Sequence, residues 1–203
     1  SGTWTGCGLI AGGAAYCWGN NDYGRVGDGT TTHRNTPVAV IGGLQFTSIV
    51  AGANLTCGLA SGGQAYCWGQ NNSGQLGDGT NIDRHQPTAV SGGHRFTQLA
   101  LGYAHTCGLT EEGMAYCWGW SSNGQVGDGG TTDRLIPTPV LGGLTFRSLI
   151  AGGRHTCGIL PTGGAMCWGL NSALPIYGGG GQLGDGTLTD RLVPTPVTGG
   201  PAF

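Results

Sequence analysis

Residues 55–69 read L-T-C-G-L-A-S-G-G-Q-A-Y-C-W-G, and this stretch decides the fold. Two short apolar segments, 56–59 and 65–68, flank a turn of sequence A-S-G-G at 60–63. A glycine-containing turn between two such segments is typical of a tight β-hairpin. We therefore predict two antiparallel strands joined by this turn.

The hairpin sequence occurs four times, at a spacing of 50 residues. Its first cysteine is Cys7, Cys57, Cys107 and Cys157, and its second is Cys17, Cys67, Cys117 and Cys167. We expect one repeat domain over 1–203, with units of about 1–50, 51–100, 101–150 and 151–203 and no appended domain. The fourth unit carries a seven-residue insertion at 174–180. A fixed period of this length indicates a solenoid, a propeller or another stacked array.

The content of one unit favours a propeller. Glycine accounts for 45 of 203 residues, and each glycine disfavours helix by about 1 kcal/mol relative to alanine. Further β segments at 88–90 and 96–101 bring the second unit to four short strands, which is the content of a propeller blade. We predict an all-β, propeller-type array of four four-stranded antiparallel blades. The array could be a small closed ring, part of a larger ring, or an open array that stacks end to end.

The repeat resembles a known family. The motif C-G-L at 57–59, Y-C-W-G at 66–69 and G-Q-L-G-D-G-T at 74–80 is similar to the repeat of the regulator of chromosome condensation family. This resemblance covers all four units and implies β-propeller blades, usually seven in a ring, with a binding surface on the ring face. Known members include a nucleotide exchange factor for a small GTPase, a plant ultraviolet receptor and a secreted inhibitor of β-lactamases. They share no common reaction.

The two cysteines of each unit are ten residues apart and flank the hairpin turn. Opposed positions of an antiparallel pair lie roughly 4.5–5.5 Å apart, which suits a disulfide. We predict four bridges, Cys7–Cys17, Cys57–Cys67, Cys107–Cys117 and Cys157–Cys167, and hence a secreted, extracellular or cell-surface protein. The alternative is reduced, buried cysteine. A zinc site is disfavoured, because the spacing is not C-x-x-C.

Other residues recur in every unit and are expected to be structural. The tryptophan after each second cysteine is predicted to pack between blades; these are Trp18, Trp68, Trp118 and Trp168. The aspartate of each G-D-G segment is predicted to cap its turn or to pair with the arginine six residues later. A calcium site is a weaker alternative, because each unit offers only one or two carboxylates. His105 and His155 are expected to be hydrogen-bonded turn residues.

Charge and motifs exclude several classes of function. Charged residues make up 9% of the chain, the net charge is −2, and the eight basic residues are scattered arginines. No basic patch is therefore expected, and we predict no nucleic-acid partner. No apolar run approaches the roughly 20 residues of a membrane span. No catalytic or phosphate-binding motif is present, so we expect neither an enzyme nor a cofactor.

Binding is expected where the units differ, which is the loop after each W-G and the insertion. The candidate residues are Tyr23, Asn71, Trp120, Ile176 and Tyr177. Exposed aromatic groups suit protein contacts or stacking on sugar rings, although they could equally pack on neighbouring blades. Two sequons, at 54–56 and 71–73, match the N-glycosylation pattern.

The main prediction is a non-enzymatic secreted protein that acts as a protein-interaction or self-assembling scaffold, with repeat edges as one contact surface. The alternative is a carbohydrate-binding propeller that uses Trp120 and Tyr177. Exchange-factor-like binding of a small GTPase is a third possibility, which paired cysteines disfavour because they fit the nucleus poorly.

Overall fold

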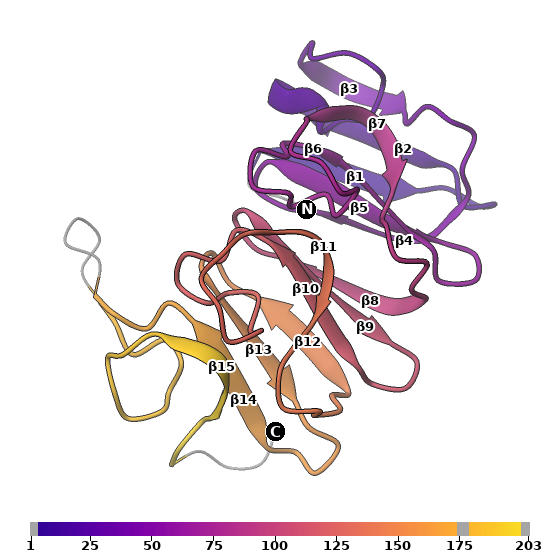
Figure 1. Cartoon of the computed structure of the whole chain (residues 1–203). Helices are drawn as coiled ribbons and strands as arrows, with labels where there is room; N and C mark the ends of the chain where they lie inside the picture. The colour runs from indigo at the N-terminus through magenta and orange to yellow at the C-terminus, as the bar shows by residue number, and fades with distance from the viewer. Residues whose placement is uncertain (1–3, 174–178, 200–203) are drawn as a thin grey trace.

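The computed structural model describes residues 4–173 and 179–199, and its regular structure is almost entirely β (Figure 1). The described strands form four antiparallel sheets, which we call blades 1 to 4. Blade 1 comprises β1 (Thr5–Leu9), β2 (Ala15–Gly19) and β3 (Arg34–Ala39). Blade 2 comprises β4 (Phe46–Ala51), β5 (Leu55–Ala60), β6 (Ala65–Gly69) and β7 (Arg84–Ala89). Blade 3 comprises β8 (Phe96–Leu101), β9 (His105–Thr110), β10 (Ala115–Gly119) and β11 (Arg134–Pro139). Blade 4 comprises β12 (Ser148–Ala151), β13 (His155–Ile159), β14 (Ala165–Gly169) and β15 (Arg191–Pro196).

The all-β blade architecture predicted from the sequence is confirmed, with one difference in blade 1. Within the described residues that blade has three strands, whereas the other three blades have four each. Among the described residues the one short helix is a 3-10 turn, η1 (Asp22–Gly24), in the loop between β2 and β3. No described helix has the length and apolar character needed to cross a membrane.

The central hairpin of each blade forms as the sequence predicts. In blade 2, β5 pairs with β6 so that Cys57 lies opposite Cys67. Gly62 and Gly63 both have φ of 81° in the connecting turn, a left-handed conformation that side chains other than glycine rarely adopt. Local turn chemistry therefore sets the strand register that brings the two cysteines together.

Two of the predicted strands are placed differently. The segment predicted at 88–90 is the end of β7, which begins at Arg84 and runs through Pro87. Proline is tolerated there because β7 is the edge strand of its sheet. The segment 96–101 is a strand, but it pairs with β9 and opens blade 3 instead of completing blade 2. Each sheet is therefore offset from the units counted in the sequence.

The core lies between the blades. Trp68, Trp118 and Trp168 have no exposed surface, and each stacks at an angle on a phenylalanine of its own blade. Each indole Nε1 donates to a backbone carbonyl of the preceding blade, with distances of 3.0, 3.0 and 2.9 Å to the oxygens of Arg25, Gln75 and Gln125. The expected packing of these tryptophans between blades is confirmed for all three.

The blades follow one another in chain order along an open array (Figure 1). Blade 1 and blade 4 lie at its opposite ends, so the described strands do not close into a small ring. Trp18 of blade 1 is 37% exposed, whereas its three counterparts are buried against a preceding blade. Part of a larger ring and an open stacking array both remain compatible with this arrangement.

Candidate functional site

The loop after each W-G is held together by one buried side chain. In blade 2 the Asn71 amide Nδ2 donates to the carbonyls of Thr80 and Ile82, at 3.0 and 3.1 Å, and its Oδ1 accepts from the Leu76 amide at 2.9 Å. Asn71 has no exposed surface. Its side chain therefore belongs to the loop framework and is not offered to a ligand, unlike the other candidate residues described below.

The same loop contains a recurring aspartate–arginine pair. In blade 2, Arg84 Nε lies 2.7 Å from Asp78 Oδ2, and the Thr80 hydroxyl donates to Asp78 Oδ1 at 2.7 Å. Burial alone would raise the pKa of Asp78, but the hydrogen bonds from Thr80 and Arg84 outweigh it and lower the pKa. The equivalent pairs Asp28–Arg34, Asp128–Arg134 and Asp185–Arg191 are also present. The predicted pairing of each G-D-G aspartate with its arginine is confirmed.

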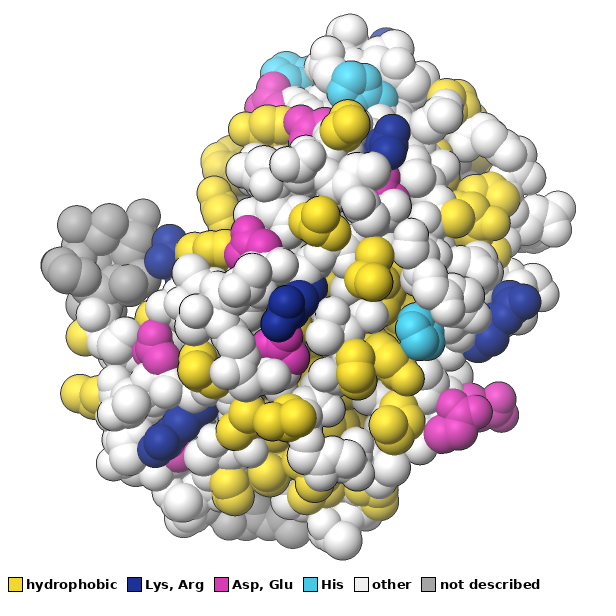
Figure 2. All heavy atoms as spheres, viewed as in Figure 1, with side chains coloured by type: hydrophobic (Ala, Val, Ile, Leu, Met, Phe, Trp, Pro, Cys, Tyr) yellow, Lys and Arg dark blue, Asp and Glu magenta, His cyan; other side chains and the backbone are white. Residues whose placement is uncertain are grey.

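Charged side chains do not gather on the visible face of the molecule. Figure 2 shows arginines that lie singly, several of them beside an acidic side chain. In the described part of the chain, no three His, Cys, Asp or Glu side chains come together in a way that could hold a metal ion. Most of the visible face is instead made of neutral polar and hydrophobic groups.

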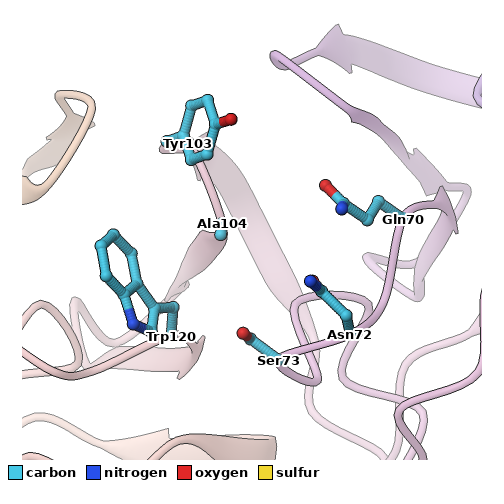
Figure 3. Close-up of a pocket in the computed structure, with 6 residues that line it drawn as sticks. All are labelled: Gln70, Asn72, Ser73, Tyr103, Ala104 and Trp120. Carbon is cyan, nitrogen blue, oxygen red and sulfur yellow. The ribbon is translucent and has the colours of Figure 1, made fainter.

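A hollow opens between blades 2 and 3 (Figure 3). It has a volume of about 310 Å³. Blade 2 contributes Gln70, Asn72 and Ser73, and blade 3 contributes Tyr103, Ala104 and Trp120. The two aromatic side chains lie on one side and the polar side chains on the other, so the hollow has an apolar wall that faces a polar wall.

The aromatic wall is supported from behind by blade 4. The Arg154 guanidinium lies 4.8 Å from the centroid of the Trp120 ring, a distance at which the cation is attracted to the ring face. The Tyr103 amide donates to the Gly153 carbonyl at 3.0 Å, and the Trp120 amide donates to the Ala104 carbonyl at 2.8 Å. Tyr103 nevertheless keeps 53% of its surface exposed.

The polar wall is held by hydrogen bonds that use the amide oxygens. Gln70 Oε1 accepts from Asn54 Nδ2 at 3.0 Å, and Asn72 Oδ1 accepts from Gln75 Nε2 at 3.2 Å. In Figure 3 the amide nitrogen of Asn72 points toward the hollow, while the Gln70 amide lies at its edge with its oxygen on the side of Tyr103. The Asn72 amide is therefore a fixed donor in front of an aromatic surface.

A related hollow of about 300 Å³ occupies the junction of blades 1 and 2. Its lining residues are Trp4, Asn20, Asp22, Tyr23, Arg25 and Asn54. Tyr23 is 40% exposed and has φ of 64°, a backbone conformation that is costly for a side chain of this size. We call the surface formed by residues 4, 20–25, 53–54, 70–75, 103–104 and 120–125 the loop face.

The candidate binding residues predicted from the sequence do not form one site. Tyr23 lines the hollow between blades 1 and 2 and Trp120 lines the hollow between blades 2 and 3, so they belong to successive junctions and not to one site. Ile176 and Tyr177 lie outside the described residues, as does most of the insertion. Sequence reasoning missed Tyr103, although the corresponding positions of the other units, Ala53 and Gly153, already showed that this position varies.

The histidine before T-C is buried in blade 3. His105 Nε2 lies 2.9 Å from Thr156 Oγ1 of blade 4, and His105 has no exposed surface. Burial, with a smaller effect of the nearby His155, lowers the pKa of His105 to about 4. His105 opens strand β9 and bonds across a junction, which corrects the expectation of a turn residue.

All four predicted disulfides are present. The bridges join the opposed cysteines of the central hairpins: Cys7–Cys17, Cys57–Cys67, Cys107–Cys117 and Cys157–Cys167. No cysteine of the chain is free. The alternatives of reduced cysteine and of a zinc site do not describe this structure.

Comparison with protein families gives one consistent match. A family model for the regulator of chromosome condensation (RCC1) repeat matches residues 12–59, 62–109 and 112–159, and a second model of the same repeat matches 46–75 and 96–125. No curated protein sequence matches the chain.

Several solved structures share the fold. Human WBSCR16 superposes with a TM-score of 0.85 at 23% identity, over 100% of this chain and 52% of that one. Yeast RCC1 (Prp20), in its complex with Kap60, gives 0.80 at 21%, over 98% and 47%. The ectodomain of the Physcomitrella patens receptor kinase CR4 gives 0.55 at 28%, over 87% and 40%. The chain spans about half the length of these proteins, and the likeness to the first two shows the fold alone.

Proposed function

Because this chain belongs to the family of RCC1 repeats, we propose that it is a non-enzymatic scaffold for protein interactions that works outside the cell. Relatives in fold bind proteins: Prp20 is seen bound to Kap60, and the Saccharomyces cerevisiae protein was examined for binding to Gsp1p and histones. An exchange-factor activity like that of known family members is not carried over, because identity to Prp20 is only 21–22%.

The loop face is the observation that carries the proposal. It presents Tyr103 and Trp120 at one junction and Trp4 and Tyr23 at the next, each beside a hollow. Tyrosine and tryptophan are the side chains most enriched among the residues that dominate binding energy at protein interfaces. Buried tryptophans pack the junctions between the blades, so these exposed groups lie on a rigid support.

The extracellular location rests on the cysteines. All eight are paired, and structural disulfides persist in oxidising compartments while they are rare in the cytosol. The CR4 relative is an ectodomain, which supports the same location. Titration of free thiols in the native, unreduced protein from its own source should give none, and eight titratable thiols would contradict both the bridges and the location.

The protein-binding role is tested by affinity capture with matched variants. The immobilised 203-residue chain is incubated with extracellular and surface proteins of its source, and captured proteins are quantified by mass spectrometry. A specific partner should be retained by the wild type and by Ile10→Ser, which alters an exposed residue away from the loop face. The double variant Tyr103→Ala/Trp120→Ala should lose it at least tenfold. Equal capture by all three proteins would contradict the role of the loop face.

Self-association is a second candidate, favoured by the two ends of the array. Blade 1 offers the half-exposed Trp18, and blade 4 offers a hollow of about 290 Å³ lined by Ile159, Val197 and Gln182 among others. Gln182 occupies the repeat position of Arg25, Gln75 and Gln125, whose carbonyls accept the tryptophan Nε1 at each junction. Light scattering on the purified chain should show masses above 20.5 kDa that fall to the monomer in Trp18→Ala. A monomer at every concentration would exclude this candidate.

A further inference from the structure

We propose that the hollow between blades 2 and 3 binds one ring of a neutral sugar, with Trp120 as the stacking surface and Asn72 and Gln70 as hydrogen-bond donors. The inference rests on the proposed function in one respect, since it names the ligand class of the same loop face. A scaffold with this site would recognise a glycan on its partner.

The aromatic wall suits the apolar side of a sugar. A pyranose carries C–H groups on one face and hydroxyl groups around its edge, so it packs flat on an aromatic ring while the hydroxyls stay polar. Trp120 lines the hollow, and Arg154 packs over its ring from blade 4. The ring is therefore held in place before a ligand arrives, which reduces the entropy lost on binding. Tyr103 extends the aromatic surface and brings a phenol hydroxyl.

The polar wall suits the edge of the same ring. With their oxygens engaged by Asn54 and Gln75, the amides of Gln70 and Asn72 keep their nitrogens as donors, and the Asn72 nitrogen points toward the hollow (Figure 3). The Ser73 hydroxyl points toward Trp120 (Figure 3) and can both donate and accept. Sugar hydroxyl and ring oxygens accept such bonds, and an alkyl ligand would leave these donors unpaired.

Charge and size narrow the ligand class. None of the six lining residues is charged, and the nearby Arg154 guanidinium is stacked on the Trp120 ring, so the lining itself favours a neutral sugar over a carboxylated or phosphorylated one. The volume of about 310 Å³ lies at the small end of ligand pockets, which favours one ring over an extended ligand. Open sides leave room for the rest of a glycan chain.

The hollow between blades 1 and 2 provides a natural comparison. It also contains aromatic groups, but Arg25 donates to the amide oxygens of Asn20 and Asn54 and to the Ala53 carbonyl. Asp22 lies 3.6 Å from the same guanidinium. The polar groups there are engaged with one another, so this hollow is not expected to bind a neutral sugar.

The site is tested by titrating methyl glycosides of glucose, galactose and mannose into the ¹⁵N-labelled chain. The indole N–H signal of Trp120, assigned by its loss in Trp120→Ala, should shift with one of them, with a dissociation constant on the order of millimolar. Trp120→Ala lacks this indole signal, so its binding is followed by the backbone amide signals of Gln70, Asn72 and Ser73, and the constant should rise at least tenfold. The exposed Asn72→Ala should raise it about two- to tenfold. Trp4→Ala, an exposed tryptophan of the other hollow, should change it less than twofold.

The outcomes separate the sugar site from the proposed function. Circular dichroism and unchanged shifts of the remaining indoles establish that each variant is folded, and Asn72→Ala stands if Trp120→Ala does not fold. If no glycoside moves the Trp120 signal at 100 times the expected constant, the sugar site is refuted. Loss of the captured partner in Tyr103→Ala/Trp120→Ala would then still uphold protein binding, now to the polypeptide itself. Equal glycoside binding by wild type and Trp120→Ala would also refute the site.

Discussion

At the scale of single residues, one buried asparagine side chain holds the loop after W-G together in blades 1, 2 and 4. Asn21, Asn71 and Asn171 each tie both sides of their loop together. Blade 3 has Ser121 at this position, whose hydroxyl makes only longer contacts of 3.4 Å to the Val126 amide and the Gly130 carbonyl. Among the described residues, the third loop therefore has the weakest side-chain bonds at this position.

We expect Ser121→Asn to stabilise the protein. The longer side chain should recreate bonds to the Val126 amide and the Gly130 carbonyl, and these should raise the free energy of unfolding by about 1 kcal/mol. Urea unfolding of the variant beside the wild type measures this. Asn71→Ser, the reverse change in blade 2, should lower stability by a similar or larger amount, and a neutral result for both would contradict the framework role.

His105 predicts how stability depends on pH. Its pKa is about 4 in the folded protein and close to 6.5 when unfolded, so only the unfolded chain takes up a proton between these values. Stability is therefore fully present above pH 6.5 and falls as the pH drops toward 4, by about 3 kcal/mol from this group. Unfolding measured from pH 7.5 to 4 should show the slope, and His105→Gln should make it shallower; burial also lowers the pKa of His155, which contributes to the same slope. The aspartates with lowered pKa act mainly below this window.

At the scale of elements, the hairpin and its disulfide were predictable because everything they need is local. Two strands, a turn and two cysteines lie within 15 residues, and the Cys57–Cys67 register follows from turn length. The membership of β8 in blade 3 was not predictable, since a repeat has no intrinsic starting point and the pairing depends on distant strands. The β7 boundary was misplaced because Pro87 reads as a strand breaker unless the strand is known to be an edge.

The four bridges should not be reduced at the same rate. In the two inner hairpins both cysteines are fully buried, whereas Cys7 and Cys157 of the outer hairpins are partly exposed. We expect increasing reductant to open Cys7–Cys17 and Cys157–Cys167 before the inner pairs, because the attacking thiolate or phosphine needs access to sulfur. Differential alkylation followed by mass spectrometry gives the order, and simultaneous reduction of all four would contradict it. Each bridge closes a loop of about ten residues and should contribute about 3 kcal/mol.

At the scale of the whole molecule, the same set of contacts joins each pair of neighbouring blades. Each junction buries a tryptophan whose Nε1 bonds to the preceding blade, and a threonine hydroxyl donates to the same carbonyl; the donors are Thr56, Thr106 and Thr156. This packing could be predicted from the sequence, because the tryptophan recurs in every unit. The aromatic wall of the loop face could not be predicted in this way, because Tyr103 and Trp120 lie opposite Gln70 and Asn72 only across a junction between two blades.

The junction model predicts unequal effects of one substitution at equivalent positions. Trp118→Phe removes a buried hydrogen bond to the Gln75 carbonyl and leaves unfilled space, so it should cost about 2–3 kcal/mol. Trp18→Phe changes a half-exposed ring with no blade packed on that side among the described residues, and should cost less than about 0.5 kcal/mol. The midpoints of urea unfolding measure both, and equal losses would show that the tryptophans act within their own blades.

The offset between sequence units and sheets has a consequence for how such a gene can change length. Because the first strand of blade 3 is encoded at the end of the second unit, a recombination that removes or adds 50 residues leaves a chimeric sheet at the seam, with strands from two ancestral units. Each described junction uses the same contact between a tryptophan Nε1 and a backbone carbonyl. A chimeric sheet can therefore make this contact with the blades on either side of it. Breakpoints can therefore fall anywhere in the repeat and still yield whole blades, which makes blade number a property that evolution can adjust without redesigning the fold.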